Sequence, residues 1–179
     1  MAVYTKINQK EINIINKNFN IEKVISFKGI KQGIENTNYL LKSKKKKYIL
    51  TIFEKRVLQK EIPFFMKLMD NLNNSKINCP KPLKTKEDKY LIKLKNKTAC
   101  IVSFLEGKDK KILNINDCYA IGKTIARMHM VTNKMKLKRK NSMGIRNLKP
   151  LLESIKFKSK KFSNLKVFLK NNLKDINKN

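Results

Sequence analysis

Three strand-like segments lie between residues 21 and 54, and only short connections separate them. The segments are residues 21–30, 38–42 and 48–54, which are rich in β-branched and aromatic side chains. The connections are too short for a crossover helix, so neighbouring segments must pair antiparallel. The second connection, 43–47, is a serine followed by four lysines, which is typical of a solvated hairpin tip. This part of the chain is therefore predicted to be a three-stranded meander.

Helical and strand patterns continue on both sides of the meander. Thr5 can cap a first helix that places Ile7, Ile14 and Ile15 on one face. After the meander we expect a helix over 61–72 and then strands over 90–94 and 98–104, with a chain break at Glu106 and Gly107. A helix over 117–130 should follow, capped by Asp117, with Ile121, Ile125 and Met128 facing inward. The last expected elements are helices around Leu151 and over 162–176. This order predicts an α+β fold: a protein-kinase-like small lobe, with a five-stranded antiparallel sheet plus a helix, and then the first helices of an incomplete helical large lobe.

The net charge of +30 needs an interpretation, because strongly basic chains often bind nucleic acid or anionic membranes. Of the 43 basic residues only four are arginine, and lysine, asparagine and isoleucine together make up 82 of the 179 residues. All three have A/T-rich codons, whereas nucleic-acid binders favour arginine for bidentate contacts. We therefore favour compositional drift of the surface. A small basic nucleic-acid-binding protein stays open as an alternative.

The cysteine and histidine content excludes two further classes of protein. Three cysteines spaced far apart and one histidine form neither a zinc site nor a disulfide framework, which fits a reducing cytoplasm. The first twenty residues lack the apolar run of a signal peptide, and no apolar stretch is long enough to span a bilayer.

The single histidine, His129, has no nucleophile or second ligand beside it, so we expect a packed, hydrogen-bonded structural residue.

The connection between the first two strands is the leading candidate for a phosphate-binding loop. Gly29 and Gly33 permit close backbone approach, and three short polar side chains follow, those of Asn36, Thr37 and Asn38. The pattern matches neither the P-loop nor the dinucleotide fingerprint. Taken alone, the local pattern favours an ordinary hairpin.

Two other places could complete a nucleotide site. Lys55 or Arg56, just after the third strand, could supply a cation for phosphates, although either is equally explained as surface charge. Glu61 could orient that cation, or simply be favoured by the dipole of the helix that it begins. The crossing after the last strand, at Ser103, Phe104 and Leu105, could offer backbone groups to an adenine edge; it is also explained by a strand that ends before a glycine turn.

Several longer segments occur in an order that resembles a known family. They are residues 26–30 (SFKGI), 33–41 (GIENTNYLL), 48–57 (YILTIFEKRV), 79–82 (CPKP), 101–107 (IVSFLEG) and 121–129, after the opening MAVYTK. Together they resemble the type II homoserine kinases, a branch of the aminoglycoside-phosphotransferase-like, protein-kinase-like family. The resemblance covers nearly the whole chain.

The resemblance implies phosphoryl transfer from MgATP to the hydroxyl of L-homoserine, in the cytoplasm, on the route to threonine. It implies a nucleotide-binding lobe over 1–105 and a hinge with a partial helical lobe over 106–179. The loop of Gly29 to Asn38 would cover the phosphates, and residues 103–105 would face adenine. Many relatives carry a lysine or arginine in the third strand, and the matching position here is Thr51, so Lys55 or Arg56 is a possible substitute.

One family motif is not found in this sequence. Family members carry a His-x-Asp-x-x-x-x-Asn catalytic loop and a later metal-binding aspartate, which together serve the substrate proton and magnesium. We therefore expect a C-terminally truncated family member, with its magnesium ligands in a missing segment and with little or no kinase activity of its own. A kinase for another small alcohol and a catalytically inactive regulatory subunit are the remaining alternatives.

Overall fold

The computed structural model describes residues 3–55, 57–141, 144–155 and 160–176. The chain forms two compact units, Met1–Leu137 and Lys138–Asn179, which are described separately. The boundary that we expected after residue 105 stays a prediction. None of the helices in the described ranges is both long and apolar enough to cross a membrane.

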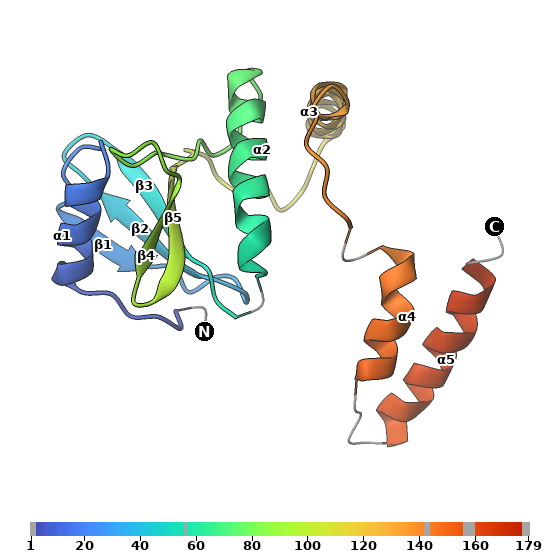
Figure 1. Ribbon diagram of the computed structural model, residues 1–179. Helices are drawn as coiled ribbons and strands as arrows, with labels where there is room; N and C mark the ends of the chain where they lie inside the picture. The colour runs from blue at the N-terminus through green and yellow to red at the C-terminus, as the bar shows by residue number, and fades with distance from the viewer. Residues whose placement is uncertain (1–2, 56, 142–143, 156–159, 177–179) are drawn as a thin grey trace. The chain divides into compact units, whose positions relative to one another are not determined.

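The first unit is built on a five-stranded antiparallel sheet with the strand order β1-β2-β3-β5-β4 (Figure 1). The strands are β1 (Ser26–Gly29), β2 (Thr37–Lys42), β3 (Lys47–Ile52), β4 (Leu91–Leu94) and β5 (Lys97–Ser103). The predicted sheet is therefore confirmed. The first strand is shorter than expected, because Asn16 hydrogen-bonds both backbone groups of Val24 and holds that residue against the first helix instead.

The first helix, α1 (Gln9–Asn18), covers one face of the sheet (Figure 1). Its N-cap is Asn8, which forms a capping box with Glu11, so the prediction that Thr5 caps this helix was wrong. Ile12 and Ile15 are buried, whereas Ile14 lies at the surface, which corrects the predicted inward face. The core under α1 also takes in Ile7, Tyr39, Leu41, Tyr48, Leu50, Ile52, Ala99 and Ile101.

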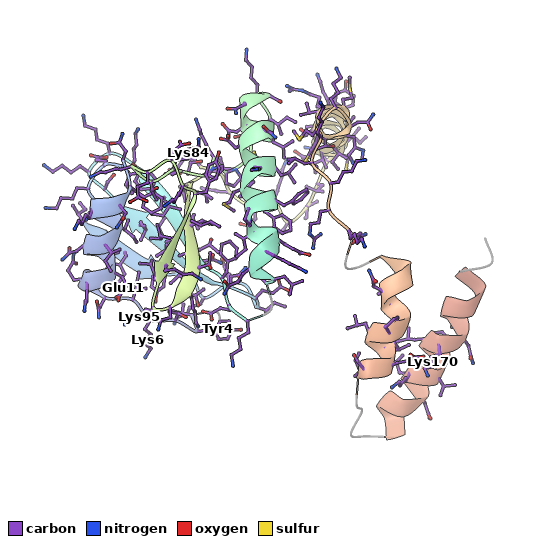
Figure 2. All side chains as sticks on the ribbon, in the orientation of Figure 1. Tyr4, Lys6, Glu11, Lys84, Lys95 and Lys170 are labelled. Carbon is purple, nitrogen blue, oxygen red and sulfur yellow. The ribbon has the colours of Figure 1, made fainter. Side chains whose placement is uncertain are left out.

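A tight turn joins β4 to β5. Its two central residues, Lys95 and Asn96, have φ values of 49° and 61°, as a type I′ hairpin turn requires. The turn points the Lys95 ammonium toward the buried Glu11 carboxylate of α1, at 3.6 Å (Figure 2). Burial raises the pKa of Glu11, but hydrogen bonds from the Asn8 backbone and the nearby Lys95 charge lower it more, so the carboxyl stays ionised.

The opposite face of the sheet is covered only in part. A single turn of 3₁₀ helix, η1 (Gln59–Glu61), leads into α2 (Ile62–Asn74), with Glu61 at the N-cap position. Ile62 and Met66 of α2 pack on Cys100 and Val102 of β5. Over β2 and β3 the side chains on this face are only half-buried. The site described below lies on this less covered part of the sheet.

The next helix, α3 (Ile115–Asn133), begins with a capping box in which Asn114 is the cap and Asp117 the third residue, so Asp117 is not the cap that we predicted. None of its residues is buried. Ile121 and Ile125 are 46% and 44% exposed, so the predicted inward face of this helix was wrong in the described structure. His129 is exposed for the same reason, and it is not the packed histidine that we expected.

The second unit contains two helices, α4 (Ile145–Ser154) and α5 (Lys160–Ile176). They lie against each other, and Leu152 is buried. Lys166 of α5 donates hydrogen bonds to the carbonyls of Glu153 and Ile155 at 3.2 and 3.0 Å, which satisfies the end of α4. Both helical patterns predicted for this region are confirmed in type.

Candidate functional site

The loop between β1 and β2 presents a run of unpaired backbone donors. Ile30 N–H donates to Asn38 O at 2.9 Å and closes the loop at its base. Among the described residues, none of the six N–H groups of residues 31–36 has a hydrogen-bond partner within the protein. Gly33 has a φ of +102°, which favours glycine and turns the chain at the middle of this run. Successive free N–H groups of this kind suit an anion.

Next to the loop lies the half-buried part of the sheet face. Along β2 and β3 the fully buried residues alternate with partly exposed ones, and Asn38, Leu40, Ile49 and Thr51 form the partly exposed row. Thr51 Oγ1 donates to Asn38 Oδ1 at 2.8 Å. A neutral hydrogen-bonded pair therefore stands at the third-strand position where many relatives carry a lysine or arginine. Leu40 and Ile49 are cross-strand partners and give the row an apolar centre that a flat ring could cover.

Two cations were expected after β3, at Lys55 and Arg56. Lys55 is exposed in the turn after β3, and Arg56 lies outside the described residues. Lys28 of β1 is also exposed; it pairs across the strands with Leu40 and therefore shares the face of the row. The sequence analysis did not single out Lys28.

The crossing after β5 carries the third element of the site. Ser103 is fixed by two hydrogen bonds with the Lys81 backbone, each 2.9 Å long. The Lys47 ammonium lies 5.1 Å from the centre of the Phe104 ring and pairs with Glu106 at 2.8 Å. In the part of the chain that the structure describes, the backbone groups of Leu105 have no hydrogen-bond partner. The contacts of Ser103 and Phe104 before Leu105, and of Glu106 after it, thus hold the crossing in place, while the N–H and C=O of Leu105 stay free to bond a ligand.

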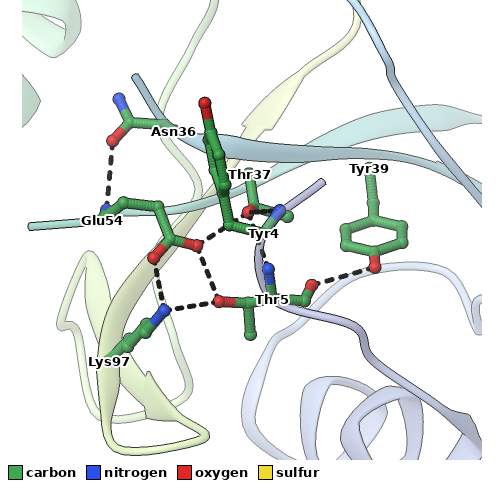
Figure 3. Close-up of polar contacts among 7 residues, drawn as sticks. All are labelled: Tyr4, Thr5, Asn36, Thr37, Tyr39, Glu54 and Lys97. Atoms are coloured by element: carbon green, nitrogen blue, oxygen red, sulfur yellow. Dashed lines mark hydrogen bonds and ion pairs between the residues drawn. The ribbon is translucent and has the colours of Figure 1, made fainter. Parts of the chain in front are cut away.

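A polar network that the sequence did not reveal lies beneath the loop (Figure 3). Glu54, just beyond β3, accepts hydrogen bonds from the hydroxyls of Thr5 and Thr37 at 2.6 and 2.7 Å. Its other carboxylate oxygen pairs with the Lys97 ammonium, which also donates to Thr5 Oγ1 at 2.7 Å. Thr5, Glu54 and Lys97 are far apart in sequence and belong to no local motif, so no periodicity or spacing could have found them.

The network keeps the largely buried Glu54 side chain in its ionised form. The Glu54 side chain is only 10% exposed. Burial raises the pKa of its carboxyl, but the hydrogen bonds donated by Lys97, Thr5 and Thr37 lower it more, so the pKa lies below its usual value. Thr37 is completely buried, and its hydroxyl also accepts from the N–H groups of Tyr4 and Thr5 at 3.0 and 3.1 Å. We therefore expect Thr37 to hold the loop rather than to touch a ligand.

The N-terminal segment also packs against the entrance of the loop. A Cβ atom at Gly29 would lie 2.9 Å from Val3 Cγ2, closer than real contacts allow, so glycine is needed for this approach. Asn36 Oδ1 accepts from Glu54 N–H at 3.2 Å at the exit. The predicted loop residues thus lie together, although only part of them faces solvent.

The described residues contain no group of three or more histidine, cysteine, aspartate or glutamate side chains that could hold a metal ion. No magnesium ligand is assigned in this part of the chain.

Comparison with known proteins adds a family match. Residues 26–168 match the phosphotransferase enzyme family. A homoserine kinase from Paramagnetospirillum magneticum is 39% identical over 156 residues, which are 87% of this chain and 48% of that protein. A homoserine kinase from Parvibaculum lavamentivorans is 37% identical over 154 residues, 86% of this chain and 48% of that protein. The chain thus spans about half the length of the curated relatives it matches.

Two solved structures share the fold at low sequence identity. Spectinomycin phosphotransferase in complex with ADP and spectinomycin superposes with a TM-score of 0.60 at 17% identity, covering 97% of this chain and 56% of that one. A microcompartment-associated aminopropanol kinase gives a TM-score of 0.61 at 12% identity, covering 80% of this chain and 48% of that one. These likenesses support the kinase-like fold of the first unit.

Proposed function

Because the chain belongs to the phosphotransferase enzyme family, we propose that its first unit is the ATP-binding part of a kinase that phosphorylates the hydroxyl of L-homoserine. The observation that carries the ATP site is the run of unpaired N–H groups at residues 31–36, beside a half-exposed apolar row. The homoserine assignment rests on the relatives that are 39% and 37% identical to the chain.

Each part of the site has a separate task in this proposal. The N–H groups of residues 31–36 donate to phosphate oxygens. The phosphates can approach this backbone closely because the loop turns at Gly33, which has no side chain. Leu40 and Ile49 lie under the adenine ring. The free N–H and C=O of Leu105 bond the adenine edge, so that a base with the opposite donor and acceptor pattern fits poorly.

The phosphate charge must be balanced by cations. We propose that Lys55 reaches the phosphates in place of a third-strand lysine, because Thr51 and Asn38 form a neutral pair at that position. Magnesium, which accompanies ATP in kinases, neutralises the charge of the transferring group when it is bound. We propose no ligand for it among the described residues. Three free thiols suit the cytoplasm that we propose as the compartment.

The direct test is isothermal titration of the full chain with ATP, adenosine and GTP, with homoserine present in a second series. We expect ATP to bind, adenosine to bind more weakly, and GTP to bind least. We also expect no O-phosphohomoserine from the chain alone. Absence of ATP binding would overturn the ATP site, and preference for another small alcohol over homoserine in a full-length relative would overturn the substrate assignment.

A matched pair of glycine variants localises the phosphates. Gly33→Ala places a side chain in a left-handed conformation at a cost of about 1 kcal/mol, and we expect weaker ATP binding with adenosine binding unchanged. Gly122→Ala, in α3 with open space around it, is the control and should leave both affinities unchanged. Equal effects of the two variants on ATP would argue against this loop as the phosphate site.

A further inference from the structure

We propose that Glu54 and Lys97 are positioning residues that hold the loop of residues 30–36 in its phosphate-binding shape, by clamping the N-terminal segment beneath it. This inference rests on the proposed ATP site. Neither residue is placed in contact with ATP. Their effect is transmitted through Thr37 and through the segment that carries Tyr4 and Thr5.

The network joins parts of the chain that are distant in sequence. Thr5 and Glu54 are 49 residues apart, and Glu54 and Lys97 are 43 residues apart. They come from the segment before α1, the segment just after β3 and the start of β5, and Figure 3 shows them converging next to the first residue of β2. A largely buried carboxylate with three donors around it has little freedom to move, so it fixes these three segments against one another.

The clamped segment and Glu54 contact the loop at its entrance, tip and exit. At the entrance, Val3 lies against Gly29. At the tip, Tyr4 Oη donates to Ile34 O at 3.0 Å. At the exit, the Thr37 hydroxyl donates to the Glu54 carboxylate, and Asn36 Oδ1 accepts from the Glu54 backbone N–H. The free N–H groups lie between these three fixed points, so their directions depend on the clamp.

Charge balance gives the pair a second reason to be present. An uncompensated carboxylate beneath a phosphate-binding loop would repel the phosphates. Lys97 compensates Glu54 within the network. Removal of Lys97 alone should therefore weaken binding of phosphorylated nucleotides more than that of a neutral nucleoside.

The test compares ATP with adenosine, since only ATP reports on the loop. We expect Thr37→Val to weaken ATP binding about tenfold while adenosine binding changes less than about twofold. Glu54→Gln should also weaken ATP binding selectively, but less, because the uncompensated Lys97 ammonium then attracts the phosphates. Thr37→Ser retains the hydroxyl and should restore ATP affinity. Glu11→Gln is the matched control: it also removes a carboxylate that pairs with a lysine near the β4–β5 turn, but Glu11 belongs to α1 and its partners are Asn8 and Lys95 rather than the loop.

Two further measurements keep the test decisive if a buried variant fails to fold. Tyr4→Phe removes only the bond to Ile34 at a largely exposed ring, and it should weaken ATP binding about threefold with adenosine unchanged. Amide hydrogen exchange at residues 31–36 in folded Tyr4→Phe should be faster than in the wild type.

The outcomes separate the two proposals. If the wild-type chain binds no ATP, the proposed function fails, and the inference falls with it. If the wild type binds ATP but the Glu54 and Tyr4 variants lose ATP and adenosine binding equally, or lose neither, the ATP site stands and the positioning role is refuted. Selective loss of ATP binding in Glu11→Gln would refute it as well.

Discussion

Replacement of Glu54 by glutamine should destabilise the first unit at neutral pH. The carboxylate accepts two hydroxyl hydrogen bonds and pairs with Lys97, and its side chain is 10% exposed. Glutamine keeps the shape and one carbonyl acceptor, but it loses the charge and turns an amide group toward the lysine. Hydrogen bonds to charged groups contribute about 1.5–3 kcal/mol each, and loss of one partner of a fully buried ion pair costs about 3–5 kcal/mol.

The expected loss lies at the lower end of these values. The Lys97 side chain is 37% exposed, so water replaces part of what the lysine loses. We therefore expect the free energy of unfolding to fall by about 2 kcal/mol. For a unit of this size, that corresponds to a decrease in Tm of roughly 6–10 °C.

The loss should depend on pH in a defined direction. The pKa of Glu54 is lowered in the folded state, so the carboxylate stabilises the fold above its unfolded pKa and this contribution disappears as the pH falls through the folded pKa. The wild type and Glu54→Gln should therefore differ fully at pH 7 and converge in acid. Urea unfolding followed by circular dichroism at pH 7 and in acid measures both quantities. A difference under about 0.5 kcal/mol at pH 7, or one that persists unchanged in acid, would refute the reasoning.

Three further predictions concern packing, thiol chemistry and charge. Gly29→Ala should displace Val3, which a Cβ would approach to 2.9 Å, and lower the free energy of unfolding by about 1–3 kcal/mol in urea titrations; an unchanged midpoint would contradict that contact. Cys118 is exposed, whereas burial raises the pKa of Cys100 to about 12, so a thiol reagent at pH 8 should label Cys118 in the native chain and Cys100 only after unfolding. The net charge of +30 should give weak, sequence-independent binding to duplex DNA that is lost by moderate salt, and tight binding at physiological salt would instead support a nucleic-acid-binding function.

The sheet could be predicted from the sequence because its signals are local. Strands β2, β3 and β5 begin and end within one or two residues of the predicted segments. Burial alternates along β2 and β3, whereas β5 is a short, continuously buried run bounded by polar residues. The first helix was harder to predict, because Thr5 and Asn8 are both plausible caps. Thr5 is used by Glu54, a contact that no local pattern contains.

The candidate site also has a part that local sequence patterns predict and a part that they do not. The loop with Gly33 and the crossing at Leu105 are continuous stretches of chain, and their character is visible in the sequence. The support beneath the loop joins residues up to 92 positions apart, such as Thr5 and Lys97. Periodicity also failed for α3, because an apolar stripe shows that a helix can be covered and does not show what covers it.

The turn at Lys95 and Asn96 bears on how this protein tolerates mutation. The turn places Lys95 beside Glu11 and Lys97 beside Glu54, whose side chains are 8% and 10% exposed, whereas the lysines at 44–46 lie at an exposed hairpin tip. A gene drifting toward A/T-rich codons can exchange the lysines at 44–46 for asparagine at little cost. The same drift at position 97 would leave an acid without its counter-charge, and a deletion within the turn would remove both pairings at once. Purifying selection should therefore act on this short hairpin far more strongly than on the lysine-rich surface around it.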